Sequence, residues 1–175
     1  DTAYLQAMHQ IGIQRLSIGV QSTHQTQLEL FGRLHDSQTV AQAVTNARVA
    51  GFDNLSLDLI YGIPQQTMTM WDETLKQVLE LGVEHVSLYA LGIEPKTAME
   101  YWIRNNKLAE PDDELAADMY DLATTVLAKY GYVQYEIANW AKPGLESEHN
   151  KQYWRNQPYL GLGPGAHGYA GNMRY

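Results

Sequence analysis

The stretch that decides the fold is Leu55-Ser56-Leu57-Asp58-Leu59-Ile60-Tyr61, which is followed directly by Gly62-Ile63-Pro64. It is nearly continuous in apolar residues apart from Ser56 and Asp58, as expected for a strand in a parallel sheet that is covered on both faces. Gly62 and Pro64 are strong turn residues and end the strand. We therefore expect one central strand with a single carboxylate inside it.

Strand and helix patterns alternate on both sides of this stretch. Ser37 is the candidate N-cap of the next helix upstream, and Gly51, Gly82 and Gly131 stand where three helices should end. The alternation indicates βα units and a parallel sheet, and hence an α/β fold. Further strands are predicted at 13–20, 85–91 and 132–137, and helices at 39–50, 70–81 and 111–131.

The composition fits one globular domain and excludes several kinds of site. Of the 175 residues, 45% are hydrophobic and 18% are charged. The 20 acidic against 12 basic residues give a formal charge of −8, which disfavours nucleic acid as a partner. There is no cysteine, so these residues cannot supply a disulfide, a thiolate nucleophile or the ligands of an iron–sulfur cluster.

The beginning of the chain indicates a piece of a longer protein. It starts at Asp1 rather than at methionine and enters an amphipathic helical pattern at once. No signal-peptide pattern and no apolar run of about 20 residues is visible. We therefore expect a fragment without an export signal or membrane anchor of its own.

Polar residues near the carboxyl ends of the predicted strands are the first candidates for a site, because ligands bind there in parallel sheets. Asp58 must either face a polar cavity or be hydrogen-bonded, for example by capping a neighbouring loop or by pairing with Arg15, since burying a lone charge is costly. Gln21 could bind a ligand or only cap a turn. Arg33 could clamp a carboxylate or lie solvated on the surface.

A second candidate is His149-Asn150-Lys151-Gln152-Tyr153-Trp154, a histidine in an expected polar loop with two aromatic residues close behind it. Such a group can ligate haem iron while the rings cover the porphyrin, or it can be a surface histidine beside core aromatics. The following Gly161–Gly168 stretch should lack regular structure. It could cradle a phosphate or merely turn, and it lacks the ending of a P-loop.

Taken together, several segments resemble the radical S-adenosylmethionine proteins of the oxygen-independent coproporphyrinogen III oxidase-like family, and within it the haem chaperones of the HemW group. The resemblance covers nearly the whole chain. The matching segments are residues 15–22, 32–35, 50–64, 135–140, 149–154 and 161–166.

The resemblance implies a partial (βα)6 TIM-like barrel, of which this chain holds the later half. Residues 1–140 would contain strands four to six with their helices, and residues 141–175 would begin the C-terminal region. Carried over by position, Gln21, Arg33, Asp58 and Gly92 would bind S-adenosylmethionine. Asp58 would accept from the ribose hydroxyls, Gln21 would bridge the ribose and the polar end, Arg33 would pair with the methionyl carboxylate, and Gly92 would lie near the adenine.

Family members also hold a [4Fe–4S] cluster on a CxxxCxxC motif, which this chain does not contain. The cluster ligands must then lie outside it, so we expect the chain alone to hold no catalytic residue of its own and to be inactive. Whether the parent protein is an enzyme stays open. The family cofactor is assembled in a reducing compartment, so a cytoplasmic location is expected.

The segment His149 to Trp154 favours the chaperone branch, in which it is associated with haem binding. His149 would ligate the iron, and Tyr153 and Trp154 would pack on the porphyrin. Expected partners are haem-accepting proteins, with respiratory enzymes as one candidate class, and a second copy through unpaired strand edges. The alternative is an oxygen-independent coproporphyrinogen III oxidase that decarboxylates porphyrinogen propionates by radical chemistry.

Overall fold

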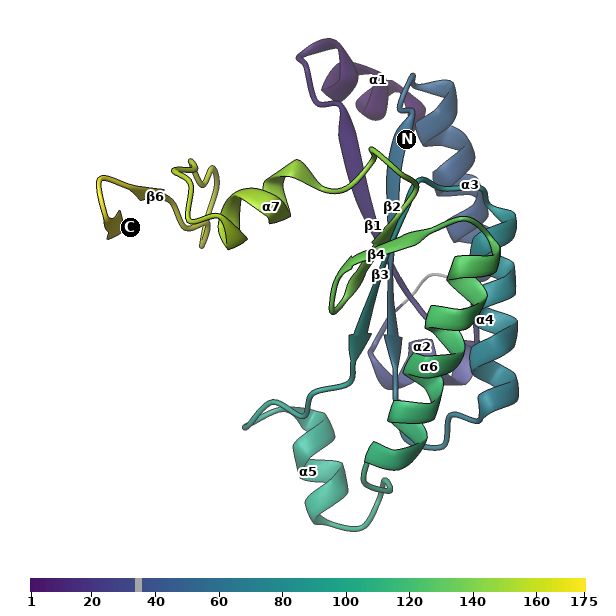
Figure 1. The fold of residues 1–175 in the computed structure, drawn as a ribbon. Coiled ribbons are helices and arrows are strands. Elements are labelled where there is room, and N and C mark those ends of the chain that lie inside the picture. Colours follow the sequence, from purple (N-terminus) through teal and green to yellow (C-terminus); the bar gives the residue numbers. More distant parts are fainter. Residues whose placement is uncertain (34–35) are drawn as a thin grey trace.

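The computed structural model describes residues 1–33 and 36–175 and contains a five-stranded sheet with helices on one side (Figure 1). The helices are α1 (Thr2–Gln10), α2 (Gln25–Leu30), α3 (Ser37–Val49), α4 (Met68–Glu80), α5 (Ala98–Arg104), α6 (Asp113–Lys129) and α7 (Glu148–Trp154). The strands are β1 (Arg15–Gln21), β2 (Asn54–Tyr61), β3 (His85–Ala90), β4 (Val133–Glu136), β5 (Asn139–Ala141), β6 (Tyr169–Ala170) and β7 (Met173–Arg174).

The sheet confirms the predicted α/β arrangement and adds an antiparallel hairpin. Its strand order is β1-β2-β3-β5-β4, with β1, β2 and β3 parallel. The predicted strand near 132–137 is observed as β4, but it pairs with the unpredicted β5, which runs antiparallel to β3. Because β5 extends to Ala141, the sheet continues one residue past the boundary expected at residue 140.

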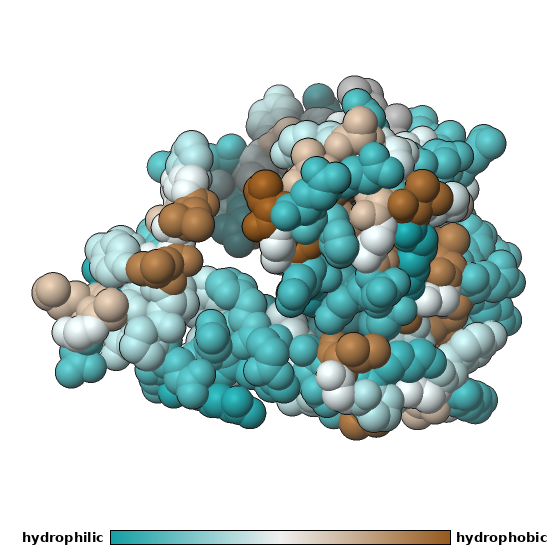
Figure 2. Space-filling model, turned by 90° about the horizontal axis from the view of Figure 1, so that it is seen from above, coloured by the Kyte–Doolittle hydropathy of each residue, from teal (hydrophilic) through white to brown (hydrophobic). Residues whose placement is uncertain are grey.

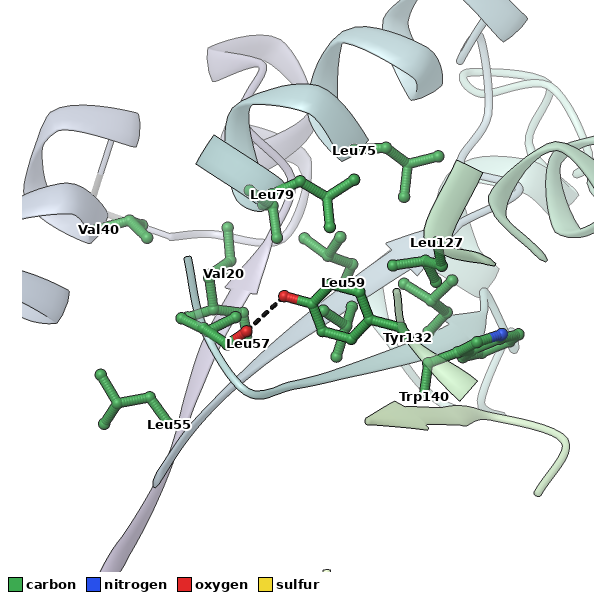
Figure 3. Close-up of a cluster of buried hydrophobic side chains, with 14 of the residues drawn as sticks. Val20, Val40, Leu55, Leu57, Leu59, Leu75, Leu79, Leu127, Tyr132 and Trp140 are labelled. Atoms are coloured by element: carbon green, nitrogen blue, oxygen red, sulfur yellow. Dashed lines mark hydrogen bonds between the residues drawn. The ribbon is translucent and has the colours of Figure 1, made fainter. Parts of the chain in front are cut away.

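Helices α3, α4 and α6 cover one face of the sheet, where the main core lies (Figures 1 and 3). Leu55, Leu57 and Leu59 of β2 are fully buried there. Each fully buried leucine contributes about 1.5–3 kcal/mol relative to an exposed one. The indole of Trp71 donates to the Met119 carbonyl at 2.8 Å, so this large ring is buried with its polar atom satisfied.

The helix ends follow ordinary capping chemistry, with one correction to the prediction. The N-cap of α3 is Asp36 rather than Ser37, because Asp36 has the extended backbone and its carboxylate accepts from the Thr39 amide at 2.7 Å. Gly51 and Gly82 follow their helices with positive φ angles, as predicted for residues that end a helix. Within the described residues no helix combines the length and apolar character needed to cross a membrane.

The last part of the chain forms an arm that leads away from the sheet (Figure 1). The segment around His149 was expected in a polar loop, which is wrong: it forms α7, because the Ser147 side chain accepts from the Asn150 amide and caps the helix. Residues 161–168 have no helix or strand, as predicted. Seen from above, the arm stands apart from the main body across an open hollow (Figure 2).

Candidate functional site

The face of the sheet opposite α3, α4 and α6 is polar. Side chains alternate along a strand, so the residues between the buried leucines of β2 point the other way. The near-continuous apolar pattern of β2 was interpreted as coverage on both faces, but its two faces differ: Ser56 and Asp58 lie on the polar one. The residues that share this face are Arg15, Ser17, Asn54, Ser56, Asp58, His85, Ser87 and Asn139.

Asp58 faces a cavity instead of forming an ion pair. Both of its carboxylate oxygens lie 2.9 Å from Ser17 Oγ, and Ser56 Oγ lies 3.4 Å from Oδ1. No ion pair joins it to Arg15 in the described part of the chain. Asp58 lines a cavity of about 540 Å³ between the sheet and the start of α7. Its free acceptor capacity is therefore available to the hydroxyl groups of a ligand.

Gln21 lies on the same face as Asp58, at the carboxyl end of β1. Its φ of +67° is in the left-handed region, and the register of β1 shifts between Gly19 and Gln21. A methyl group on Gly19 would lie 2.7 Å from Gln21 Nε2, so the amide folds back over the glycine, which pairs with Asp58. Strained backbone of this kind costs about 1–3 kcal/mol and is concentrated at functional sites.

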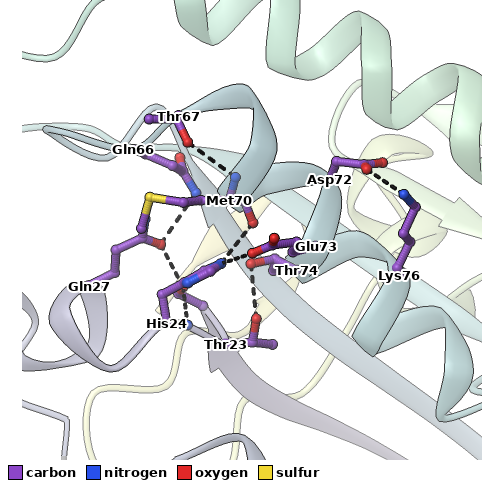
Figure 4. A network of polar contacts seen from close by, with 11 residues as sticks. Thr23, His24, Gln27, Gln66, Thr67, Met70, Asp72, Glu73, Thr74 and Lys76 are labelled. Carbon is purple, nitrogen blue, oxygen red and sulfur yellow. Dashed lines mark hydrogen bonds and ion pairs between the residues drawn. The ribbon is translucent and has the colours of Figure 1, made fainter.

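A polar network fixes the turn that follows Gln21 (Figure 4). Ser22 Oγ donates to Gln27 Oε1 at 2.6 Å and accepts from the His24 amide. His24 Nε2 lies 3.0 Å from the Met70 carbonyl, and the hydroxyls of Thr23 and Thr74 are 3.1 Å apart. These bonds join α2 to α4. The hydrogen bonds of residues 22–24 therefore stabilise the turn that begins at Gln21 and, with it, the left-handed conformation of Gln21.

The other two predicted residues lie farther along, beyond the strand ends. Gly92 follows β3 and lines a second cavity of about 540 Å³, together with Gly32 and Ile60. Arg33 directly follows Gly32, and its side chain is exposed. The remaining residues of that matching segment, Leu34 and His35, lie outside the described residues. The structure thus brings Gln21 together with Asp58, and Gly92 together with the residue that precedes Arg33.

Sequence analysis did not single out His85, which lies at the centre of the polar face. It is fully buried, with Nδ1 2.8 Å from Ser56 Oγ and Nε2 2.6 Å from the Tyr135 hydroxyl. Burial, and secondarily the charge of Arg15, lowers the pKa of His85 to about 3. The ring is therefore neutral at physiological pH. The signal in the sequence was its place in β3, since His85 and Ser87 alternate with apolar residues as Ser56 and Asp58 do.

These contacts connect the polar face to the start of α7. Ser147, the N-cap of that helix, donates its amide hydrogen to the Tyr135 hydroxyl at 3.1 Å. Burial raises the pKa of Tyr135, so its hydroxyl stays protonated. A chain of hydrogen bonds thus runs from Asp58 through Ser56, His85 and Tyr135 to Ser147.

Helix α7 separates the three residues predicted to bind haem into two groups. His149 and Tyr153 are four residues apart and lie on one side of the helix, with ring centroids 4.7 Å apart. Tyr153 also packs against Tyr159 at 4.2 Å. Trp154 turns toward Tyr135 instead, at 5.8 Å. His149 itself lines the cavity that contains Asp58.

The residues present do not fit an iron–sulfur cluster but do fit a polar small molecule. The sequence has no cysteine, and no group of three or more metal-ligating side chains occurs in the described ranges. The polar face, in contrast, combines the acceptor carboxylate of Asp58, which lines the cavity, with the Gln21 amide, which folds over Gly19. This arrangement is suited to a ligand that carries hydroxyl groups.

Comparisons with known proteins indicate which family the chain resembles. A model of the Radical SAM superfamily matches residues 1–78. The chain is 41% identical over 170 residues to the haem chaperone HemW of Bacillus subtilis, covering 97% of this chain and 45% of that protein. It is also 41% identical over 175 residues to HemW of Synechocystis, covering 100% of this chain and 42% of that protein. The chain thus spans less than half the length of these relatives.

A solved structure extends the likeness to the fold. The coproporphyrinogen III oxidase HemN of Escherichia coli, described as a radical SAM enzyme, superposes with a TM-score of 0.82 at 25% identity, covering 99% of this chain and 43% of that one. This fit confirms the fold expected for the later part of a radical SAM barrel. The chain is similar to the radical S-adenosylmethionine superfamily over residues 1–78 and, along nearly all of its length, to haem chaperones of the HemW type.

Proposed function

We propose that this chain is the part of a HemW-type haem chaperone in which bound S-adenosylmethionine and bound haem meet. The observation that carries the proposal is the cavity lined by both Asp58 and His149. These two residues belong to separate segments of the sequence, and each was assigned to a different ligand. The 41% identity to two HemW proteins supports the same assignment.

In this proposal S-adenosylmethionine lies along the polar face, toward the carboxyl ends of the strands. Asp58 accepts from the ribose hydroxyls and the Gln21 amide bridges toward the polar end. Arg33 pairs with the methionyl carboxylate, and Gly92 lies beside the adenine. A [4Fe–4S] cluster supplies reductive cleavage of S-adenosylmethionine in radical SAM chemistry. Its ligands would come from residues outside this chain.

Haem would be held by α7. The His149 imidazole supplies a nitrogen for the iron, and the rings of Tyr153 and Trp154 are 41% and 48% exposed, which leaves them accessible to a porphyrin. The chaperone would pass the haem to acceptor proteins in the cytoplasm, among which respiratory enzymes are candidates. Residues 1–140 then supply barrel strands four to six, and residues 141–175 begin the region that carries haem.

A second candidate is favoured by the structural likeness to HemN. With a TM-score of 0.82, the parent protein could instead oxidise a porphyrinogen, abstracting a hydrogen atom from a propionate side chain. The two functions differ in what they require of His149. A haem chaperone needs an iron ligand at this position, whereas a porphyrinogen carries no iron and requires none.

The test is a haem titration of the chain, followed by its Soret absorbance, beside the His149→Ala variant. We expect a saturable, shifted band for the unaltered chain and its loss in His149→Ala. His9→Ala is the matched control, because His9 is also exposed but lies on α1, at the other end of the sequence, and should keep the band. A band that survives His149→Ala would contradict the proposal.

A further inference from the structure

The cavity between the sheet and α7 contains a cation that has no ion-pair partner within the described residues. Arg15, at the start of β1, lines this cavity, and its Nε is buried without a hydrogen-bond partner. A buried charged donor without a hydrogen-bond partner keeps the full penalty of its removal from water. The charge therefore remains available to a ligand that enters the cavity.

The acidic residues around the cavity do not form an ion pair with Arg15. Glu146 and Glu148 are paired with Lys151, at 3.5 Å and 2.5 Å. Asp58 accepts hydrogen bonds from Ser17 and forms no ion pair with Arg15. Each carboxylate of the cavity thus has its own partner.

Arg15 keeps its charge in this position. Burial lowers its pKa, while Tyr135, Asp58 and Tyr89 act in the opposite direction. Arginine nonetheless stays protonated in proteins, because its intrinsic pKa is so high. A planar guanidinium binds a carboxylate through two parallel hydrogen bonds, which makes a carboxylate the most suitable ligand.

Asn54 gives a second, independent indication of a ligand at the same place. It pairs with Arg15 across the parallel strands, and its Oδ1 is also buried without a partner. The orphaned atom is an acceptor, so Asn54 presents a donor only after a half-turn of its amide, which exchanges the oxygen and the NH₂ group. In that orientation Asn54 and Arg15 both offer donors to the cavity that they line. Two unsatisfied polar groups at one register position are unusual in a folded protein.

The location of Arg15 distinguishes between two sources of a carboxylate. Arg15 begins β1 and Gln21 ends it, a separation of about 20 Å for an extended strand. The methionyl carboxylate of S-adenosylmethionine is expected near the carboxyl ends of the strands. Arg15 lies instead at the amino end, where Ser147 and His149 of the α7 region line the same cavity.

We propose that Arg15 and Asn54 form a carboxylate subsite that receives a propionate of the haem whose iron is bound by His149. This inference rests on the proposed function, because it takes haem as the ligand of α7. It adds a second point of attachment, and so fixes the porphyrin in one orientation across the cavity. Iron ligation and propionate binding then become separable contributions to affinity.

The test compares haem with haem dimethyl ester, in which both propionates lack charge. Each is titrated into the unaltered chain, Arg15→Gln and Arg15→Lys, and the Soret band is recorded. We expect Arg15→Gln to bind haem about tenfold more weakly, with Arg15→Lys in between, because a charge-assisted pair is lost. The ester should bind the unaltered chain and Arg15→Gln equally. Thermal melting by circular dichroism checks that both variants are folded.

Three results would overturn the subsite. Equal haem affinity of the unaltered chain and Arg15→Gln would show that Arg15 contacts no propionate. Equal weakening for haem and its ester would indicate a structural role. Weaker binding of S-adenosylmethionine with haem binding unchanged would assign the carboxylate to that ligand instead. If the unaltered chain gives no saturable Soret band at all, the proposed function itself fails, which is a different outcome from these three.

Discussion

The two faces of the β1–β3 sheet are made from alternate residues of the same strands, yet one face is apolar and the other is polar. One is packed by α3, α4 and α6 around Leu57 and its neighbours (Figure 3). The other carries Asp58 and His85, and part of it borders an open cavity under α7. In β2, neighbouring residues such as Leu57 and Asp58 therefore belong to the core and to the candidate site, respectively.

This difference teaches that stability and binding can be changed separately in this molecule. The helix-covered face loses apolar burial when it is altered, which affects the free energy of unfolding. The open face loses hydrogen-bonding groups instead, and those that line the cavity, such as Ser17 and Asp58, are accessible to a ligand. His85 and Ser56 are fully buried polar groups on this face, so altering them should also affect stability.

The largest expected effect is at Leu57, on the covered face. Leu57→Ala should lower the free energy of unfolding by about 2–5 kcal/mol, since it removes buried methyl groups and leaves a cavity. Urea unfolding measures the loss. Ser17→Ala, on the neighbouring strand and the open face, is the matched control and should cost less than about 1 kcal/mol. Similar losses for the two variants would remove the distinction between the faces.

A smaller effect is expected from the protonation of His85. Its folded pKa of about 3 is below the ordinary 6.5, so below pH 6.5 the unfolded chain takes up a proton that the folded chain does not. The stability that this residue contributes is therefore lost as pH falls from about 6.5 toward 3. Between pH 7 and pH 5 the loss should be about 2 kcal/mol.

The variant His85→Gln isolates this contribution. It removes the titrating group while keeping a side chain that can donate and accept. Urea unfolding of both proteins at pH 7, 6 and 5 should show a difference that shrinks as the pH falls, because only the unaltered chain loses the stability of a neutral buried ring. A difference that does not change with pH would mean that His85 is not held neutral.

The covered face could be predicted from the sequence better than the open one. The strand at 55–61 and the helices that end at Gly51 and Gly82 are decided by local apolar periodicity and turn residues, and all of them are observed. The β5 strand was missed because it has only three residues. Its formation depends on pairing with β3, which is a contact distant in sequence.

Individual residues of the candidate site could be predicted from the sequence, but their arrangement around one cavity could not. Resemblance selected Asp58 and His149, yet only the folded chain places both on one cavity. The alternation of His85 with apolar residues indicates only which face it lies on, whereas the surroundings of Arg15 and His85 are set by burial and by residues on other strands. The helix around His149 was missed because the stretch is polar and seven residues long, and its start depends on the Ser147 cap.

On the open face, Asp58→Asn should leave folding nearly unchanged and weaken binding of S-adenosylmethionine. The amide replaces one acceptor oxygen by a donor, and loss of a charged hydrogen bond to a ribose hydroxyl corresponds to about tenfold in affinity. Equilibrium dialysis with labelled S-adenosylmethionine measures this in a protein that also contains the cluster-binding region. Asp53→Asn is the matched control, because Asp53 is exposed just before β2. If the two variants bind equally well, Asp58 does not contact the ligand.

The smallest expected effect tests the connection between the open face and α7. Tyr135→Phe removes the hydroxyl that bonds to His85 and to the Ser147 amide, so it should cost about 1 kcal/mol of overall stability. Because Ser147 caps α7, we expect hydrogen exchange of the α7 amides to accelerate severalfold, while that of β2 stays the same. Tyr4→Phe, at an exposed position of α1, should change neither. If α7 exchanges at its original rate in Tyr135→Phe, then the helix is held by its aromatic contacts at Tyr153 and not by the hydrogen bonds that begin at Asp58.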